Sequence, residues 1–139
     1  MENKELAFLL GRIALGINFL AHGIVRLPKL NEFSKGMVKG FQETLIGFDS
    51  FIYVFSFVLV FVEFILGFTL ILGLKTRLSL IIANFLMMCL IFGASMQEKW
   101  GVVGSQMVYV AFLFLLINGQ VSTRYSIDSI LDKGSSLNR

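Results

Sequence analysis

Four apolar runs, at residues 6–25, 51–74, 78–96 and 102–118, constrain how this chain can fold. A helix rises about 1.5 Å per residue, so about 20 apolar residues cross the roughly 30 Å hydrocarbon layer of a bilayer. The runs therefore predict an all-α membrane protein. We expect a single domain over residues 1–139, folded as a four-transmembrane-helix bundle with both termini on one side.

Composition supports this class of protein. Of the 139 residues, 56% are hydrophobic and only 15% are charged, whereas about a quarter of the residues in a typical soluble domain are charged. The lysines and arginines are scattered through the loops, which excludes a nucleic-acid-binding surface. The single cysteine, Cys89, excludes an internal disulfide and a Cys-x-x-Cys pair. We expect it to be an inert, packed or lipid-facing thiol.

Two segments are too polar to span a membrane. Residues 29–45 have apolar side chains every three or four positions with lysines between them, which predicts an amphipathic interfacial segment between the first two spans. Residues 119–139 form a polar, serine-rich tail. With the termini inside, seven of the twelve Lys and Arg residues lie inside and five outside, which favours cytoplasmic termini.

The first run has two different faces when it is plotted at about 100° per residue. One face is apolar and suits contact with lipid. The other face combines small and polar side chains: Gly11, Arg12, Gly16, Asn18, Phe19, His22, Gly23 and Arg26. Lipid cannot satisfy polar side chains, so we expect this second face to contact other helices.

Ionisable groups inside the spans need partners, because each costs about 2.5–3.5 kcal/mol at mid-membrane on insertion scales. Counted from the ends of the spans, Glu63 lies near the midplane and Arg12 lies about 8 Å from its level. We therefore expect an inner layer of Arg12, Glu63 and Asn84. The Arg12–Glu63 pair is interpreted either as a structural ion pair or as a group that handles protons or substrate. Asn84 is interpreted as a hydrogen bond between helices.

The same count places His22 in an outer layer, about 13 Å above Glu63. Its expected neighbours are Arg26, Gln97, Glu98 and Gln106, with Tyr53 and Tyr109 nearby. Two interpretations of His22 remain open. It is either a hydrogen-bonded helix end or a donor and proton carrier for a quinone-like carbonyl or a thiol substrate. One histidine and one cysteine give no recognisable metal-ligand spacing, so we predict no metal site.

Short motifs follow one another in order along nearly the whole chain. They are Arg12-Ile-Ala-Leu-Gly16, Phe19-Leu-Ala-His22-Gly23, Lys29-Leu30 with Phe33, Phe61-Val-Glu63, Gly67, Leu72-Gly73-Leu74, Thr76-Arg77, and Gly119 with Tyr125-Ser-Ile-Asp128. Together they resemble the DoxX family. The chain has Gly104-Ser-Gln106 where many relatives have Gly-Glu, and it lacks the family's third-helix histidine.

The resemblance implies a multi-pass protein of the bacterial inner membrane. The family includes the small membrane subunit of a thiosulfate:quinone oxidoreductase and a membrane partner of redox enzymes in oxidant defence. We accordingly expect a subunit that supports quinone-linked thiol, sulfur or oxidant-defence chemistry, with a quinone as its hypothesised ligand. No cofactor motif is encoded, so a flavin, haem or thiol group would come from a protein partner.

Specific residues are assigned to this role. The catalytic candidates are His22, Glu63 and Arg12, and the ligand-binding candidates are His22, Arg26, Glu98, Gln106, Asn18 and Asn84. An alternative is a non-catalytic assembly, scaffold or chaperone subunit that docks a partner membrane protein. We expect the chain to have a protein partner or to form a homo-oligomer. A transporter is disfavoured, because the spans show neither an inverted repeat nor a broken helix pair. Whether the chain has catalytic activity of its own is left open.

Overall fold

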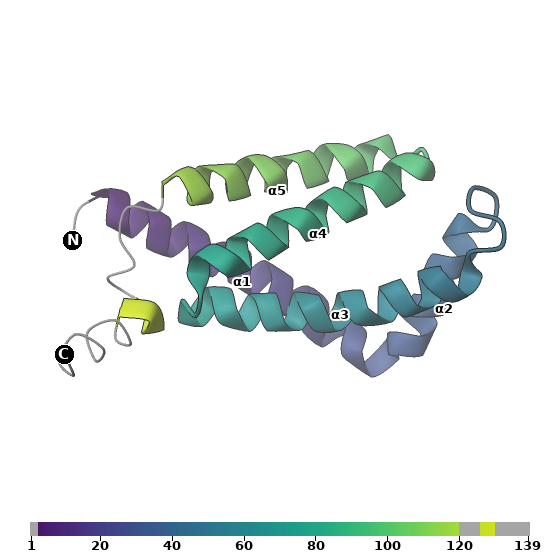
Figure 1. Ribbon diagram of the computed structural model, residues 1–139, viewed down its shortest axis with the longest axis horizontal. Helices are drawn as coiled ribbons and strands as arrows, with labels where there is room; N and C mark the ends of the chain where they lie inside the picture. The colour runs from purple at the N-terminus through teal and green to yellow at the C-terminus, as the bar shows by residue number, and fades with distance from the viewer. Residues whose placement is uncertain (1–2, 120–125, 130–139) are drawn as a thin grey trace.

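The computed structural model describes residues 3–119 and 126–129, in which helices are joined by short turns (Figure 1). The elements are α1 (Asn3–Arg26), η1 (Leu27–Lys29), α2 (Leu30–Phe41), α3 (Asp49–Leu72), α4 (Thr76–Met96) and α5 (Trp100–Asn118). Apart from Gly119 and residues 126–129, the predicted polar tail lies outside the described residues. The start of α1 and the end of α5 lie at the same end of the bundle (Figure 1).

Local sequence explains where α3 and α4 begin and end. Gly73 follows α3 with φ +69°, and Lys75 precedes α4 with φ +43°. Glycine adopts the left-handed conformation at no steric cost, so Gly73 ends the helix cleanly. The Leu74 N–H then donates to the Thr69 carbonyl at 2.9 Å, which satisfies a carbonyl left open at the end of α3.

Glycines fix how α1 packs against α3. A Cβ added to Gly16 would lie 2.8 Å from Ile71 Cγ1, and one added to Gly23 would lie 2.8 Å from Phe64 Cα. Between these two contacts, Gly67 of α3 lies against the backbone of Leu20. The helices approach too closely for a side chain at these three positions. Because α1 and α3 are antiparallel, the contacts place Glu63 at the level of the last turn of α1.

The chain changes direction at η1, where Pro28 lies at the start of the short 3-10 turn. Helix α2 then continues alongside the first half of α3, where the Tyr53 hydroxyl lies 3.0 Å from Asn31 Oδ1. The end of α2 reaches α4: the Phe41 ring lies 3.2 Å from where a Cβ at Gly93 would be. Helix α2 thus bridges α3 and α4 at one end of the bundle. Its position relative to the membrane surface stays a prediction.

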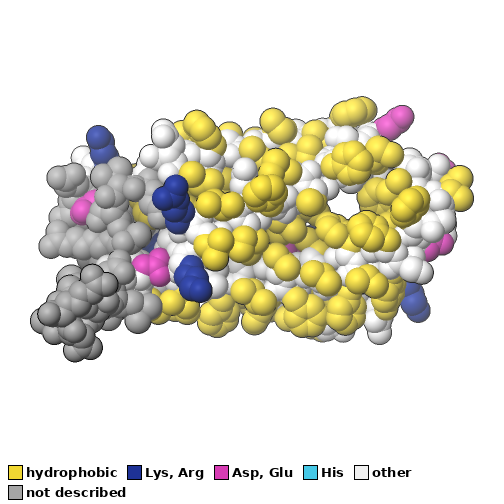
Figure 2. Space-filling view, viewed as in Figure 1, with side chains coloured by type: hydrophobic (Ala, Val, Ile, Leu, Met, Phe, Trp, Pro, Cys, Tyr) yellow, Lys and Arg dark blue, Asp and Glu magenta, His cyan; other side chains and the backbone are white. Residues whose placement is uncertain are grey.

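Among the residues that the structure describes, four helical segments are long and apolar enough to cross a membrane: the run through α1 and α2, then α3, α4 and α5. Apolar side chains cover the middle of the face shown in Figure 2, while Lys, Arg, Asp and Glu side chains gather toward its two ends. This is the surface expected of a protein with lipid around its middle. The predicted all-α four-helix membrane bundle is confirmed, and the chain is a multi-pass membrane protein.

Candidate functional site

A cavity of about 540 Å³ lies between all five helices, in the half of the bundle that contains α2. Its wall combines the second half of α1, helix α2, the part of α3 up to Glu63, the second half of α4 and the first half of α5. Figure 2 shows the surface hollowed between α3 and α4 near this end. Natural ligand sites commonly measure about 300–1,000 Å³ and are mostly apolar with a few polar groups. The cavity has that size and that mixture.

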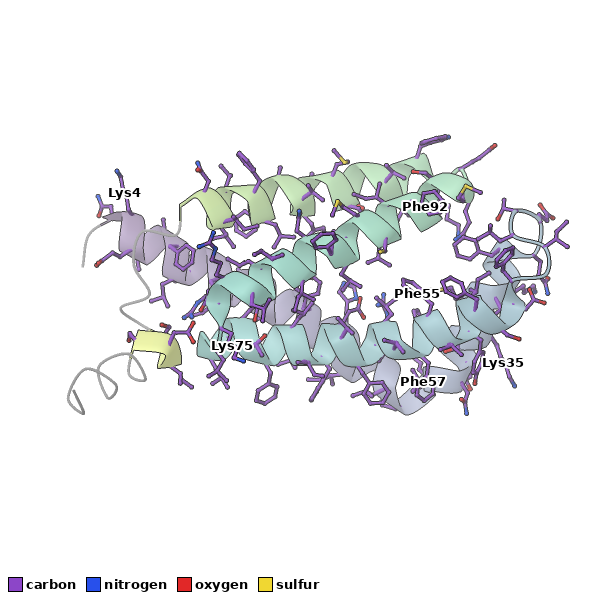
Figure 3. All side chains as sticks on the ribbon, viewed as in Figure 1. Lys4, Lys35, Phe55, Phe57, Lys75 and Phe92 are labelled. Atoms are coloured by element: carbon purple, nitrogen blue, oxygen red, sulfur yellow. The ribbon has the colours of Figure 1, made fainter. Side chains whose placement is uncertain are left out.

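Aromatic side chains form much of the apolar wall. Phe19, Phe33, Phe41 and Phe55 line the cavity together with Met37, Leu59, Met87 and Leu90. Figure 3 shows Phe55 on the side of α3 that faces α4, whereas Phe57 lies on the opposite side of the same helix. The alternation follows from helical geometry, since positions two apart lie on different faces. A flat ring would find aromatic faces and edges to pack against here.

Arg26 and Glu63 form an ion pair in the cavity wall. Arg26 Nη1 donates to Glu63 Oε1 at 2.7 Å and to Oε2 at 2.5 Å. The Glu63 side chain is only 4% exposed and that of Arg26 is 25% exposed. The Arg26 guanidinium carbon also lies 4.6 Å from the centroid of the Phe33 ring, a cation–π contact. One arginine therefore joins the end of α1 to α2 and α3.

The expected pairing of Arg12 with Glu63 is wrong, since Glu63 pairs with Arg26. That expectation assumed that neighbouring spans begin and end at the same depth in the membrane. The glycine contacts instead set Gly23 against Phe64, which brings the last turn of α1 down to Glu63. The separation of His22 from Glu63 into two layers is wrong for the same reason, because both residues line the cavity.

Arg12 lies at the other end of the bundle, where it is buried. Its guanidinium occupies the space next to Gly73 that a Cβ there would need. Its charge acts on Asp128, whose carboxylate accepts hydrogen bonds from the backbone N–H groups of Lys75 at 2.7 Å and Thr76 at 2.8 Å. Burial acts to raise the pKa of Asp128, but the bonds from Thr76 and Lys75 and the charge of Arg12 lower it, and the net direction is down.

The other polar groups of the cavity come from α1 and α5. The Tyr109 hydroxyl lies 3.4 Å from Asn18 Oδ1, a long contact that joins these two helices across the cavity. His22 lines the cavity and is exposed, so its imidazole is accessible to a ligand. Gln106 completes this side of the wall.

Gln106 Oε1 is fully buried and accepts no hydrogen bond from any described residue. Asn84 Oδ1 shares that property, but Asn84 is not among the residues that line the cavity. A buried acceptor without a donor costs about 1–3 kcal/mol.

The structure gathers five of the predicted site residues around one cavity: Asn18, His22, Arg26, Glu63 and Gln106. It does not bring Arg12, Asn84 or Glu98 into that wall. Cys89 is exposed and also lines the cavity.

Sequence reasoning did not assign the aromatic wall or Lys99, which lines the cavity near Gly40. The sequence did contain the residues that set the position of Glu63 along α1. They are Gly16, Gly23 and Gly67, where α1 and α3 pack most closely.

The arrangement offers a ligand hydrogen bonds and charge in an apolar surround. His22 and Lys99 can donate hydrogen bonds, and Arg26 carries a positive charge held in place by Glu63. Within residues 3–119 and 126–129, no group of three or more His, Cys, Asp or Glu side chains is placed to hold a metal ion. The chemistry of the wall suits an aromatic molecule with polar ring substituents.

Comparison with known proteins identifies one relationship. Residues 7–96, more than half of the chain, match the family model described as DoxX. This stretch begins within the second turn of α1, contains α2, α3 and α4, and ends at the last residue of α4. No curated protein and no solved structure matches the chain.

Proposed function

The chain belongs to the DoxX family, and we propose that it binds the ring of a quinone in the cavity as a subunit of a quinone-linked redox system. Support comes from the cavity itself, where aromatic side chains surround the Arg26–Glu63 pair and His22. A quinone ring needs flat apolar surfaces for its faces and hydrogen-bond donors for its carbonyl oxygens. Both kinds of group line this one cavity.

Each polar residue has a role in this proposal. The His22 imidazole donates a hydrogen bond to one carbonyl oxygen of the ring. The Arg26 guanidinium stabilises negative charge that develops on an oxygen during reduction, and Glu63 holds Arg26 in position. Reduction of a quinone takes two electrons and two protons and yields a hydroquinone. A partner oxidoreductase that oxidises a thiol or sulfur compound supplies the electrons.

The proposed location is the bacterial inner membrane with the termini in the cytoplasm. Counted along the sequence, seven of the twelve Lys and Arg residues are expected on the terminal side, which agrees with the excess of positive charge in cytoplasmic loops. The cavity then lies in the half of the bundle nearer the outer surface.

Titration of the purified protein with decylubiquinone, followed by calorimetry, tests the proposal. We expect saturable binding that His22→Ala weakens about tenfold, as loss of a hydrogen bond worth about 1.4 kcal/mol would. Ile17→Ala is the matched control, because Ile17 is an exposed residue of the same helix outside the cavity wall. Absence of binding to the wild-type protein contradicts the proposal.

The alternative of an assembly or scaffold subunit predicts a different result from the same preparation. One large partner copurifies with the wild-type protein, and Glu63→Gln weakens that association while decylubiquinone has no effect on it. That outcome would replace the quinone proposal with the scaffold function.

A further inference from the structure

The wall of the cavity differs from one side to the other. Contacts run from α1 to α3, from α3 to α4, from α4 to α5 and from α5 back to α1, so the α1–α5 side lies opposite the α3–α4 side. Asn18, His22 and Tyr109 line the α1–α5 side. The residues of α3 and α4 that line the cavity are apolar apart from Glu63, which is paired with Arg26. A ligand with one polar end and one apolar end matches this difference.

An opening between α3 and α4 leads out of the cavity on its apolar side. The two helices diverge from the turn that joins them (Figure 1), and Figure 2 shows the surface hollowed between them. Phe55 of α3 faces α4 (Figure 3). Helical spacing places Leu90 on the same face of α4 as Ser79 and Gly93. Phe55 and Leu90 both line the cavity and are partly exposed, so they form the rim of this α3–α4 opening.

Contacts close the α3–α4 opening at both of its ends. The Ser79 hydroxyl donates to Thr69 Oγ1 at 3.0 Å at the end nearer the connecting turn. At the other end, the Phe41 ring of α2 lies 3.2 Å from where a Cβ at Gly93 would be. Ser79 and Gly93 are separated by about 21 Å of helix, and each lies three residues inside an end of α4. The opening therefore lies within the roughly 30 Å hydrocarbon layer that the helix crosses, and it leads into lipid.

We propose that the α3–α4 opening holds the apolar tail of the ligand, an inference that rests on the proposed function and narrows its substrate class to membrane quinones with a long hydrocarbon tail. The ring lies in the cavity with an oxygen toward His22, and the tail passes between Phe55 and Leu90 into the bilayer. The quinone enters and leaves sideways by the same route. Phe55 and Leu90 are then specificity-determining residues for the tail.

A bulkier residue at the rim should separate tailed from tailless ligands. Leu90→Trp fills space that the tail needs, and overpacking of this kind is unfavourable. We expect this variant to weaken binding of decylubiquinone about tenfold more than binding of the tailless dimethoxy-methyl-benzoquinone, both measured by calorimetry. Leu78→Trp is the matched control, because Leu78 is an exposed residue of the same helix that does not line the cavity. It should leave both affinities unchanged, within about twofold.

A second measurement needs only the wild-type protein, so it decides the question even where Leu90→Trp does not fold. A decylubiquinone with a diazirine in the middle of its tail is photolysed on the protein in lipid nanodiscs, and mass spectrometry locates the adducts. We expect adducts on α3 and α4 around Phe55 and Leu90. Excess decylubiquinone should abolish them, which separates a tail held at the site from one that is dissolved in the lipid.

The outcomes separate this inference from the proposed function. An equal effect of Leu90→Trp on both ligands, or displaceable adducts on α1 and α5 instead, overturns the route between α3 and α4 and leaves the quinone site standing. Binding of neither ligand by the wild-type protein overturns both proposals. A selective loss of decylubiquinone binding in Leu90→Trp, together with displaceable adducts on α3 and α4, supports the inference.

Discussion

Arg26 and Glu63 lie 37 positions apart in the sequence and meet in the wall of the cavity, with Arg26 Nη1 within 2.7 Å of both carboxylate oxygens. The two partners differ in burial: the Glu63 side chain is 4% exposed and that of Arg26 is 25% exposed. Loss of Arg26 therefore leaves an unpaired charge that is almost fully buried, whereas loss of Glu63 leaves an unpaired charge that is partly exposed. The ion pair joins the last residue of α1 to the middle of α3.

The first prediction concerns the stability of this pair. Arg26→Met should destabilise the protein more than Glu63→Met, because it leaves the more buried charge without its partner. Breaking a buried pair costs about 3–5 kcal/mol, whereas replacing both partners with apolar residues is often neutral. We expect the double variant to be more stable than Arg26→Met alone. Thermal unfolding of the four proteins in detergent measures the coupling. Losses that simply add in the double variant would show that the two side chains do not interact.

The second prediction concerns the contact between α1 and α3. Gly67→Ala should destabilise the bundle by about 1–3 kcal/mol, since the added methyl would overlap the backbone of Leu20. Gly36→Ala is the control, because nothing lies within 4 Å of a Cβ at that helical position. That substitution should be neutral or stabilise α2 by up to about 1 kcal/mol through helix propensity. Unfolding midpoints compare the two variants. Equal midpoints would contradict the close packing at Gly67.

The helices themselves were predictable from the sequence because their causes are local. Each observed span begins and ends within three residues of the predicted run, since apolar length sets the span and residues such as Pro28 and Gly73 end it. The set of polar residues on α1 was predictable too. A side chain that lipid cannot satisfy must face protein, and helical periodicity identifies which side chains share a face.

The partners of those residues were not predictable from span ends. Depths counted from the ends of the spans put Arg12 opposite Glu63. The register of α1 against α3 is instead set by the contacts between glycines and the facing backbone. With Gly23 against Phe64, the level of Glu63 is one residue beyond Gly23, three residues before η1 begins. Helix α2 then covers the part of α3 that α1 does not reach. That offset brings Arg26 to Glu63, and both residues line the cavity.

The third prediction concerns Asp128, which caps the start of α4. Its backbone N–H donates to the Gly73 carbonyl at 3.1 Å, and its carboxylate accepts from Lys75, Thr76 and the Thr76 hydroxyl. One residue thus satisfies groups at the end of α3 and the start of α4. Loss of a helix cap costs about 0.5–2 kcal/mol, so Asp128→Ala should destabilise the protein by about that amount at pH 7.

The effect of Asp128→Ala should depend on pH. The pKa of Asp128 in the folded protein lies below the ordinary value of 3.8, because the bonds from Thr76 and Lys75 and the charge of Arg12 outweigh burial. The ionised carboxylate therefore contributes its full stability above the ordinary value and loses it as the pH falls through the lower folded pKa. Unfolding midpoints of the wild-type and variant proteins should approach each other on acidification below pH 3.8. A constant difference down to pH 2 would contradict this role.

The fourth prediction uses the chain's single cysteine as a reporter of the cavity. Cys89 is exposed and lines the cavity, and the sequence contains no other thiol to react. A maleimide should therefore label the purified protein at one site, and a ring bound between Leu90 and the aromatic wall should slow that labelling at least about fivefold at a ligand concentration above Kd. The rate is measured by mass spectrometry with and without decylubiquinone. Cys89→Ser, which should not label, identifies the site.

His22→Ala should restore most of the unprotected rate at a quinone concentration that protects the wild-type protein, because weaker binding leaves the cavity empty more of the time. Quinone binding detected by calorimetry with no change in the labelling rate would place the ligand elsewhere on the protein.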